Sequence, residues 1–437
     1  MKTKAGIIFY PWFKLLVFVF TLALGIASPG FAASVVVTAD RMIDVLDGRV
    51  VEEPVVVVTD GRIVSVVGRG GARPIVPVGA TRIDLPGKTL LPGLIDMHVH
   101  LTILPEIGRA RRLQYSDSFW SAVGVANAER TLRAGFTTVR NLGSFFFQDV
   151  GLRQAIDGGW IAGPRIVSAG YKLCATGGQC EPNEFPPSFD RTEPSAVNSP
   201  AEGRARVRWL HKYGAQVIKI SATGSGFTKG VGFGGQELSR EEMQAIVEEA
   251  HMLGLKVAAH AHGDNGIRNA ILAGVDTIEH ASLASDATIA LAAQHHTWFD
   301  MDLYRADHIL ANGIANGATQ QRLDSEKMIS RLQREAFRKA LRAGVPMLFG
   351  TDAGVYPHGD NGRQFARMVE WGMTPMQAIQ SATRNAAMAL DWETDVGAIA
   401  VGRWGDMIAV TGDPLADIRV LEHVDVVIKG GKLVKKD

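Results

Sequence analysis

The sequence contains few cysteines and no excess of charge of either sign. Two cysteines among 437 residues exclude a disulfide scaffold and a four-cysteine zinc site. Lys and Arg total 46 and Asp and Glu total 45, so the formal net charge of +1 provides no field that would attract nucleic acid. Hydrophobic residues at 46% and charged residues at 21% exclude disorder and fibrous folds. Glycine is abundant, with 48 residues, which suits a fold with many strand-to-helix turns.

Residues 1–32 have the pattern of a secretory signal peptide. Three lysines precede a short apolar run at 15–26, and the small residues Gly30 and Ala32 follow it. A permanent N-terminal membrane anchor is the alternative, but the run is shorter than the roughly 20 residues that span the hydrocarbon core. We therefore expect cleavage after Ala32 and a periplasmic or secreted protein without a stable membrane anchor. In such an oxidising compartment Cys174 and Cys180 either pair, which is favoured, or remain two free thiols.

Both ends of the chain are rich in expected strands. Short apolar stretches follow one another from Ser34 onward, with Asp60-Gly61 as a hairpin turn, and the same style returns near the C-terminus. No helical period appears between residues 34 and 90. We expect the two ends to meet in one small, split β-sandwich that is formed by residues 33–90 and 396–437.

The middle of the chain, residues 91–395, alternates apolar strands with amphipathic helices. Eight such alternations predict a (β/α)8 barrel, an α/β fold that typically needs about 250 residues. The long segments 171–199 and 304–320 are expected to be loops that shape the active-site face. The expected strands are 90–97, 137–142, 165–169, 216–221, 256–260, 276–280, 297–302 and 346–350. The expected helices include 121–134, 202–213, 240–253 and 325–343.

Histidine and aspartate residues follow four of the expected barrel strands. His98 and His100 end the first strand, and both imidazoles are expected to point into the barrel mouth because side chains two apart share one face of a strand. One such pair is a weak signal, but the pattern recurs on other strands. Nitrogen and carboxylate ligands of this kind suit zinc or another divalent transition metal. The further residues of this pattern are His260, His262, His280 and Asp352.

Lys219 stands out because it lies within an apolar strand. Its neighbours Ile218 and Ile220 are apolar, and a lysine that points into a barrel is costly unless it is paired or chemically changed. One alternative is a side chain that reaches the rim or pairs with Asp352. Beside the ligand-type residues of the other strands, we favour a carbamate formed from Lys219 and carbon dioxide, because it would be an anionic ligand able to bridge two metal ions.

Together these motifs resemble those of the amidohydrolase superfamily. The resemblance rests on Pro-Gly-Leu-Ile-Asp-Met-His-Val-His at 92–100, on Lys219, on the later histidines and on Thr-Asp-Ala-Gly at 351–354, and it covers nearly the whole chain after residue 32. The chain is most similar to the secreted imidazolonepropionase-like branch, which contains Xaa-Pro and Xaa-Arg/Lys dipeptidases and amidohydrolases that cleave ochratoxin A. Segments similar to that branch are 139–143, 175–178 and 356–361.

The resemblance implies a binuclear centre with two divalent metal ions, zinc first among them, that share a bridging hydroxide. Asp352 would take the proton of this hydroxide and deliver it to the leaving amine. Lys219, carboxylated by carbon dioxide, would bridge the two ions. The ligands implied for the more buried ion are His98, His100 and Asp352, and those for the second ion are His260 and His280.

Four residues are predicted to contact the substrate. The resemblance assigns His262 and Gln179 to the substrate carboxylate, although relatives usually have a histidine where Gln179 stands, and a glutamine cannot become a cation. Tyr304 either reaches the substrate or packs on its neighbours, and His358 either forms a pocket wall or orients a metal ligand. Arg140 is expected to be an internal ion-pair partner. The histidines expected at surface or helix positions are His211, His251, His295, His296, His308 and His423.

The predicted function is metal-dependent hydrolysis of the amide bond of a small molecule. The expected substrates are N-acyl amino acids or dipeptides with a free C-terminal carboxylate, including amides similar to ochratoxin A. One alternative is the hydrolysis of a lactone or cyclic amide, and another is a mononuclear deaminase, against which Lys219 argues. A non-catalytic periplasmic binding protein would be expected to lose ligands, and this chain has the full set. Barrel relatives often form symmetric assemblies, so we expect a homo-oligomer.

Overall fold

The computed structural model of the chain describes residues 34–107, 109–181, 183, 185–186, 188, 194–225, 231–315 and 318–437. The expected signal peptide at 1–32 lies outside these residues, so its prediction stays untested. Among the described helices, none combines the length and the apolar character that a membrane crossing requires.

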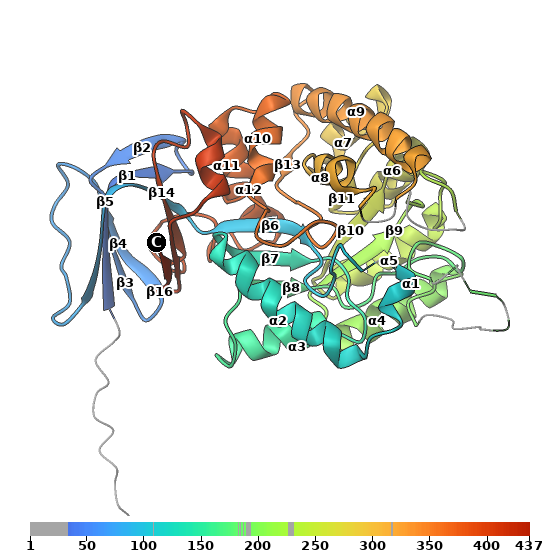
Figure 1. Cartoon of the computed structure of the whole chain (residues 1–437), viewed down its shortest axis with the longest axis horizontal. Coiled ribbons are helices and arrows are strands. Elements are labelled where there is room, and N and C mark those ends of the chain that lie inside the picture. The colour runs from blue at the N-terminus through green and yellow to red at the C-terminus, as the bar shows by residue number, and fades with distance from the viewer. Residues whose placement is uncertain are drawn as a thin grey trace, which may run out of the picture. The chain divides into compact units, whose positions relative to one another are not determined.

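Strands from the two ends of the chain lie side by side in one eight-stranded sheet (Figure 1). Its order is β16-β15-β14-β5-β1-β3-β4, and β2 pairs with β1. The expected hairpin turn joins β3 to β4, where Asp60 and Gly61 have positive φ angles of 50° and 80°. Side chains from both ends, among them Val56, Met407 and Ile428, share one apolar core. The strands are β1 Ser34–Asp44, β2 Arg49–Glu52, β3 Val55–Thr59, β4 Arg62–Val67, β5 Thr81–Pro92, β14 Met407–Thr411, β15 Val426–Lys429 and β16 Lys432–Lys436.

The predicted α/β barrel is confirmed, and each expected strand has a counterpart. The first strand differs in its start: residues 90–92 complete β5, and β6 begins only at Leu94. Gly93 lies between the two strands, and a side chain does not fit there because a Cβ atom would lie 2.2 Å from Oγ1 of Thr137. The barrel strands are β6 Leu94–Val99, β7 Phe136–Asn141, β8 Arg165–Ser168, β9 Val217–Ser221, β10 Lys256–Ala261, β11 Thr277–His280, β12 Trp298–Asp300 and β13 Met347–Leu348.

These parallel strands form two arcs, β6-β7-β8 and β13-β12-β11-β10-β9. In the described part of the chain no continuous ladder closes the ring, and individual hydrogen bonds join the arcs at both seams. Leu173 N donates to Lys219 O over 2.8 Å at one seam, and Met97 N donates to Phe349 O over 2.9 Å at the other. Parallel strands bring their carboxyl ends to one edge, so the residues that follow them surround a single mouth.

Helices cover the outside of the barrel strands (Figure 1). The serines before α4 and α5 cap them, and Ser239 forms a reciprocal capping box with Glu242. The expected loop at 304–320 is wrong in part, because α8 occupies Arg305–Asn312. Tyr304, the residue before α8, makes no side-chain cap that would have indicated a helix. The helices are α1 Arg109–Arg112, α2 Asp117–Arg133, α3 Gln148–Asp157, α4 Pro200–Lys212, α5 Arg240–Met252, α6 Asp264–Leu272, α7 Asp286–His295, α8 Arg305–Asn312, α9 Gln320–Arg342, α10 Arg363–Glu370, α11 Pro375–Ser381, α12 Arg384–Ala389 and the 3-10 helix Ile418–Glu422.

Candidate metal centre

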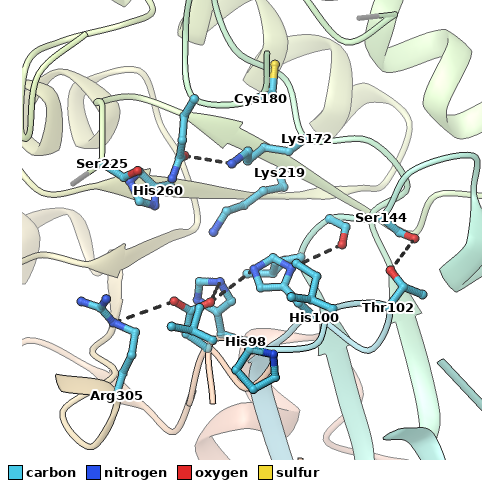
Figure 2. A pocket seen from close by; sticks show the side chains of 18 of the residues that line it. His98, His100, Thr102, Ser144, Lys172, Cys180, Lys219, Ser225, His260 and Arg305 are labelled. Atoms are coloured by element: carbon cyan, nitrogen blue, oxygen red, sulfur yellow. Dashed lines mark hydrogen bonds and ion pairs between the residues drawn. The ribbon is translucent and has the colours of Figure 1, made fainter. Parts of the chain in front are cut away.

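A cavity of about 440 Å³ lies at the carboxyl ends of the barrel strands. This volume is in the range of small-molecule sites in proteins. Figure 2 shows His98 and His100 on one side of the pocket and Lys172, Lys219 and His260 on the other. All six residues predicted as metal ligands line this cavity. They are His98, His100, Lys219, His260, His280 and Asp352.

His98, His100 and Asp352 form one cluster of ligand-type atoms. Nε2 of His98 lies 3.6 Å, and Nε2 of His100 3.3 Å, from Oδ1 of Asp352. A parallel bridge between Val99 and Ala353 brings the two segments together. The potential ligand atoms of the three residues lie within 4.8 Å of one another, which is close enough to hold one divalent ion.

His260 and His280 lie in a second cluster, together with His262. The strand register places Ala261 beside His280, and the ring centroids of His260 and His280 are 4.6 Å apart. The potential ligand atoms of the three histidines again lie within 4.8 Å of one another. Nε2 of His260 is buried without a hydrogen-bond partner among the described residues. A buried polar atom left without a partner is costly, and a metal ion would supply that partner.

Lys219 lies on β9 with a side chain that is only 1% exposed. Its Nζ has no hydrogen-bond partner among the residues that the structure describes. Burial lowers the pKa of this amine to about 8, so a larger fraction of it than of an ordinary lysine is neutral near neutral pH. Neutral amine is the form that reacts with carbon dioxide. The rim position considered from the sequence is therefore wrong, because the side chain is buried, and the carbamate stays a prediction.

The Thr-Asp-Ala-Gly motif forms a tight turn after β13. Asp352 adopts a left-handed backbone with φ of 58°, an uncommon conformation that aims its carboxylate at the histidines. A Cβ atom at Gly354 would lie 2.7 Å from the carbonyl oxygen of His100, so only glycine fits there. Asp96 holds the turn from β6, because its Oδ2 accepts hydrogen bonds from Oγ1 of Thr351 at 2.6 Å and from Nδ2 of Asn361 at 2.8 Å.

Two buried carboxylates, neither of which was predicted to have a role, orient the histidines. Oε2 of Glu279 lies 3.0 Å from Nδ1 of His98, and Oδ1 of Asp302 lies 2.8 Å from Nδ1 of His280. Such pairs fix the ring orientation and raise the basicity of the other nitrogen. The prediction that Arg140 is an internal ion-pair partner is confirmed, because its Nη2 lies 2.9 Å from Oε1 of Glu279. The signal was present in the sequence, as an acidic residue at the ends of expected strands six and seven.

Burial keeps histidines of the site neutral. It lowers the pKa of His98 to about 3 and that of His260 well below its usual range. Neutral imidazole is the form that binds a metal ion. Burial alone would raise the pKa of Asp352, but its contacts with His98 and His100 hold that pKa below the usual range. The carboxylate is therefore ionised at neutral pH.

Comparisons with known proteins identify the family. The model of the Amidohydrolase family matches residues 89–434. The chain belongs to the amidohydrolase family. It is 35% identical to a Xaa-Pro dipeptidase whose crystal structure has methionine bound in the active site, with a TM-score of 0.86 and coverage of 92% of this chain and 99% of that chain. It is also 28% identical to ochratoxinase of Aspergillus niger, over 89% of this chain and 84% of the relative.

The solved structure of A. niger ochratoxinase covers 93% of this chain and 96% of its own, with a TM-score of 0.82 and 27% identity. These relatives confirm the resemblance to the imidazolonepropionase-like branch. The chain is a hydrolase that acts on amide bonds. The family is generally metal-dependent, and the donor set fits this requirement, because it is rich in histidine and carboxylate and includes buried nitrogens on Lys219 and His260 that lack partners among the described residues.

Gln179 and His262 of this amidohydrolase both line the cavity, as expected of residues near the substrate. His262 is held by a 2.9 Å hydrogen bond between its Nδ1 and Oγ of Ser282. Gln179 lies in a short loop that a disulfide between Cys174 and Cys180 closes, which confirms the favoured pairing. The disulfide therefore fixes the segment that carries Gln179 to the cavity wall.

Tyr304 and His358 do not line the cavity, so the predicted substrate contacts of both are not supported. The Tyr304 ring packs edge-on against Tyr356, with centroids 5.1 Å apart. His358 instead links Oγ1 of Thr131, at 2.9 Å, to the carbonyl oxygen of His100, at 3.1 Å, and so supports the strand end that carries a ligand. The expectation for His308 is incomplete, because α8 carries it to the cavity wall. The other five histidines expected at surface or helix positions lie outside the cavity lining: His211, His251, His295, His296 and His423.

Proposed function

We propose that this amidohydrolase uses two divalent metal ions, with zinc as the first candidate, to cleave N-acyl amino acids or dipeptides that carry a free C-terminal carboxylate. Amides similar to ochratoxin A belong to this class, since a relative is an ochratoxinase. The dipeptidase with bound methionine is a second relative that supports it.

The position of Lys219 carries the proposal. Its amine is buried, and it lies close enough to both histidine clusters that its charge lowers the pKa of His98 and of His260. A carbamate at this nitrogen would add two anionic oxygen atoms that the clusters could share. The retention of the six predicted ligand residues around one cavity argues against a non-catalytic binding protein.

The chain's own residues position the substrate and move protons. When bound, the two ions activate a water molecule as the nucleophile and polarise the amide carbonyl. Asp352, ionised at neutral pH, accepts a proton from the attacking water and returns it to the leaving nitrogen. His262 and Gln179 contact the substrate carboxylate from the cavity wall. Glu279 and Asp302 hold the rings of His98 and His280 in place during the reaction.

The same proposal includes the compartment and the assembly. The protein acts in the periplasm or is secreted, after removal of residues 1–32, and it assembles as a homo-oligomer. The disulfide between Cys174 and Cys180 supports an oxidising compartment, because disulfides persist there and are rare in the cytosol. Mass spectrometry of the exported protein would give its first residue, and light scattering would give its oligomeric state.

The test is metal analysis together with product analysis. The chain from residue 33 onward, loaded with zinc and bicarbonate, is expected to hold two metal ions and to release free amino acids from a mixed library of N-acyl amino acids and dipeptides. Protein that holds two ions but releases no amino acid would contradict the proposed substrate class. Lactones and cyclic amides would then be the compounds to assay.

A lysine variant tests the carbamate separately. Lys219→Ala is expected to lose most of its metal and its turnover, and a short carboxylate such as acetate should restore part of both, because it can occupy the space of the missing side chain. Lys212→Ala, on the exposed side of α4, is the control and should keep both properties. Full activity of Lys219→Ala without added carboxylate would exclude a bridging role.

A further inference from the structure

A group of apolar side chains lines the cavity and has no part in the mechanism above. Each of them is buried or half-buried, so it is shielded from the outer solvent. None belongs to, or packs against, the apolar cores that the structure describes, so the cavity is the space that these side chains adjoin. This apolar wall consists of Ile103, Leu104, Ile107, Ile309 and Val355.

The apolar wall lies on the side of the cavity that carries the first cluster of ligand-type atoms. Three of its members lie in the segment 103–107, which follows β6, and Val355 lies in the turn after β13. The two segments touch, because a Cβ atom at Gly354 would lie 3.3 Å from Cβ of Ile103. Figure 2 shows Thr102, the residue before this segment, on the same side of the pocket as the first cluster.

The opposite side of the cavity is polar. Figure 2 shows Lys172 and His260 there, and the proposed carboxylate contacts His262 and Gln179 follow β10 and β8 in the chain. The carboxylate and the acyl group of an N-acyl amino acid lie on opposite sides of its amide bond. A substrate whose carboxylate is held at the polar side therefore directs its acyl group toward the apolar wall.

Both parts of the apolar wall are held in place from outside the cavity. Nδ2 of the buried Asn127 donates hydrogen bonds to the carbonyl oxygens of Leu101 at 2.8 Å and of Ile103 at 3.1 Å. Asp307 of α8 forms ion pairs with arginines of α9 and α10 at 2.5 and 2.6 Å, so the helix that carries Ile309 is anchored as well. A surface that is formed before the ligand arrives binds it at a lower cost in conformational entropy.

We infer that the apolar wall is a binding subsite for an apolar acyl group, so that the preferred substrates are amides of amino acids with aliphatic or aromatic acids. This inference rests on the proposed function, and it names the chemical class of the acyl group that the proposed function leaves open. Each methylene group that the wall removes from water should improve kcat/KM by about two- to fourfold.

The experiment keeps the amino acid fixed and varies the acyl group. The amino acid is the one that the metal-loaded wild type releases fastest, and the acyl groups are acetyl, butanoyl, heptanoyl and methoxyethoxyacetyl. The last has the length of heptanoyl, but ether oxygens replace methylene groups. We expect kcat/KM of the wild type to rise about 30-fold or more from acetyl to heptanoyl, and to fall again for the ether compound.

Variants of the apolar wall test which residues form the subsite. Leu104→Asn and Ile309→Ala should each lose about three- to tenfold in kcat/KM for the heptanoyl compound and stay within about twofold for the acetyl compound. The matched controls are Leu113→Asn and Ile314→Ala, because these side chains are 51% and 60% exposed and lie outside the cavity lining. Both controls should behave as wild type, and all four variants should keep the metal content of wild type.

The outcomes separate this inference from the proposed function. A flat or falling kcat/KM of wild type from acetyl to heptanoyl would overturn the inference and leave the proposed function intact. Equal losses of Leu104→Asn and Ile309→Ala on the acetyl and heptanoyl compounds would also overturn it, because the wall would then support the fold or the metal ligands. If metal-loaded wild type hydrolyses none of the compounds, the proposed function fails, and the inference fails with it.

Discussion

The strand ends and the loops around the mouth of the barrel are built in different ways. At the strand ends, alternation along β6 and the register between β10 and β11 bring His98, His100, His260 and His280 to one edge of the barrel. At the mouth, Gln179 reaches the wall because a disulfide closes its loop. The positions of the metal-side histidines thus follow from strand alternation and register, whereas the position of Gln179 depends on a loop that a local disulfide closes.

The largest effect should come from Asp352. Asp352→Asn keeps the shape of the side chain but removes the proton acceptor, so kcat should fall by about 10³-fold or more while much of the metal stays bound. Steady-state kinetics and metal analysis of the same preparation measure both. Asp360→Asn, a partly exposed carboxylate of the following loop, is the control and should behave as wild type. Unchanged turnover in Asp352→Asn would remove its acid–base role.

The next effect should come from Asp302. Its Oδ1 lies 2.8 Å from Nδ1 of His280, so Asp302→Asn should weaken metal binding by about 10- to 100-fold through loss of ring orientation. Turnover should return when metal is added in excess, as titration with zinc would reveal. Glu326→Gln is a matched control, because Glu326 also lies beside Arg305 but contacts no histidine ligand. Equal metal affinity of both variants would contradict the orienting role.

Much of the strand-end region could be predicted from the sequence, since the ligand residues lie at the ends of apolar strands. Spacing along the sequence alone shows which side chains share one face of a strand. The partners Glu279 and Asp302 were within the expected strands, but only tertiary packing shows that they face histidines. The mouth was predicted less well. Helix α8 turns Tyr304 toward Tyr356 and brings His308 to the cavity, and no spacing rule carries that information.

A smaller effect should follow from opening the disulfide. Cys174→Ser with Cys180→Ser frees the loop that carries Gln179, so KM for carboxylate substrates should rise by about three- to tenfold, with kcat nearly unchanged. Reduction of the wild type with a phosphine, which unlike dithiols does not chelate zinc strongly, should have the same effect. A fall in metal content instead would show that the loop supports the strand ends, and the contrast between the two regions would then be lost.

The smallest effect should come from substitution of Tyr304. This variant tests which residues around the barrel mouth contact the substrate. Its ring packs on Tyr356 outside the cavity lining, so Tyr304→Phe keeps this contact and should leave kcat and KM within about twofold of wild type. His308→Ala is the informative comparison, because His308 lies on α8, which follows Tyr304, and lines the cavity. Its loss should change KM by more than the loss of the Tyr304 hydroxyl. If Tyr304→Phe raised KM more than His308→Ala, the tyrosine hydroxyl would reach the bound substrate, which would require α8 to move when the substrate binds.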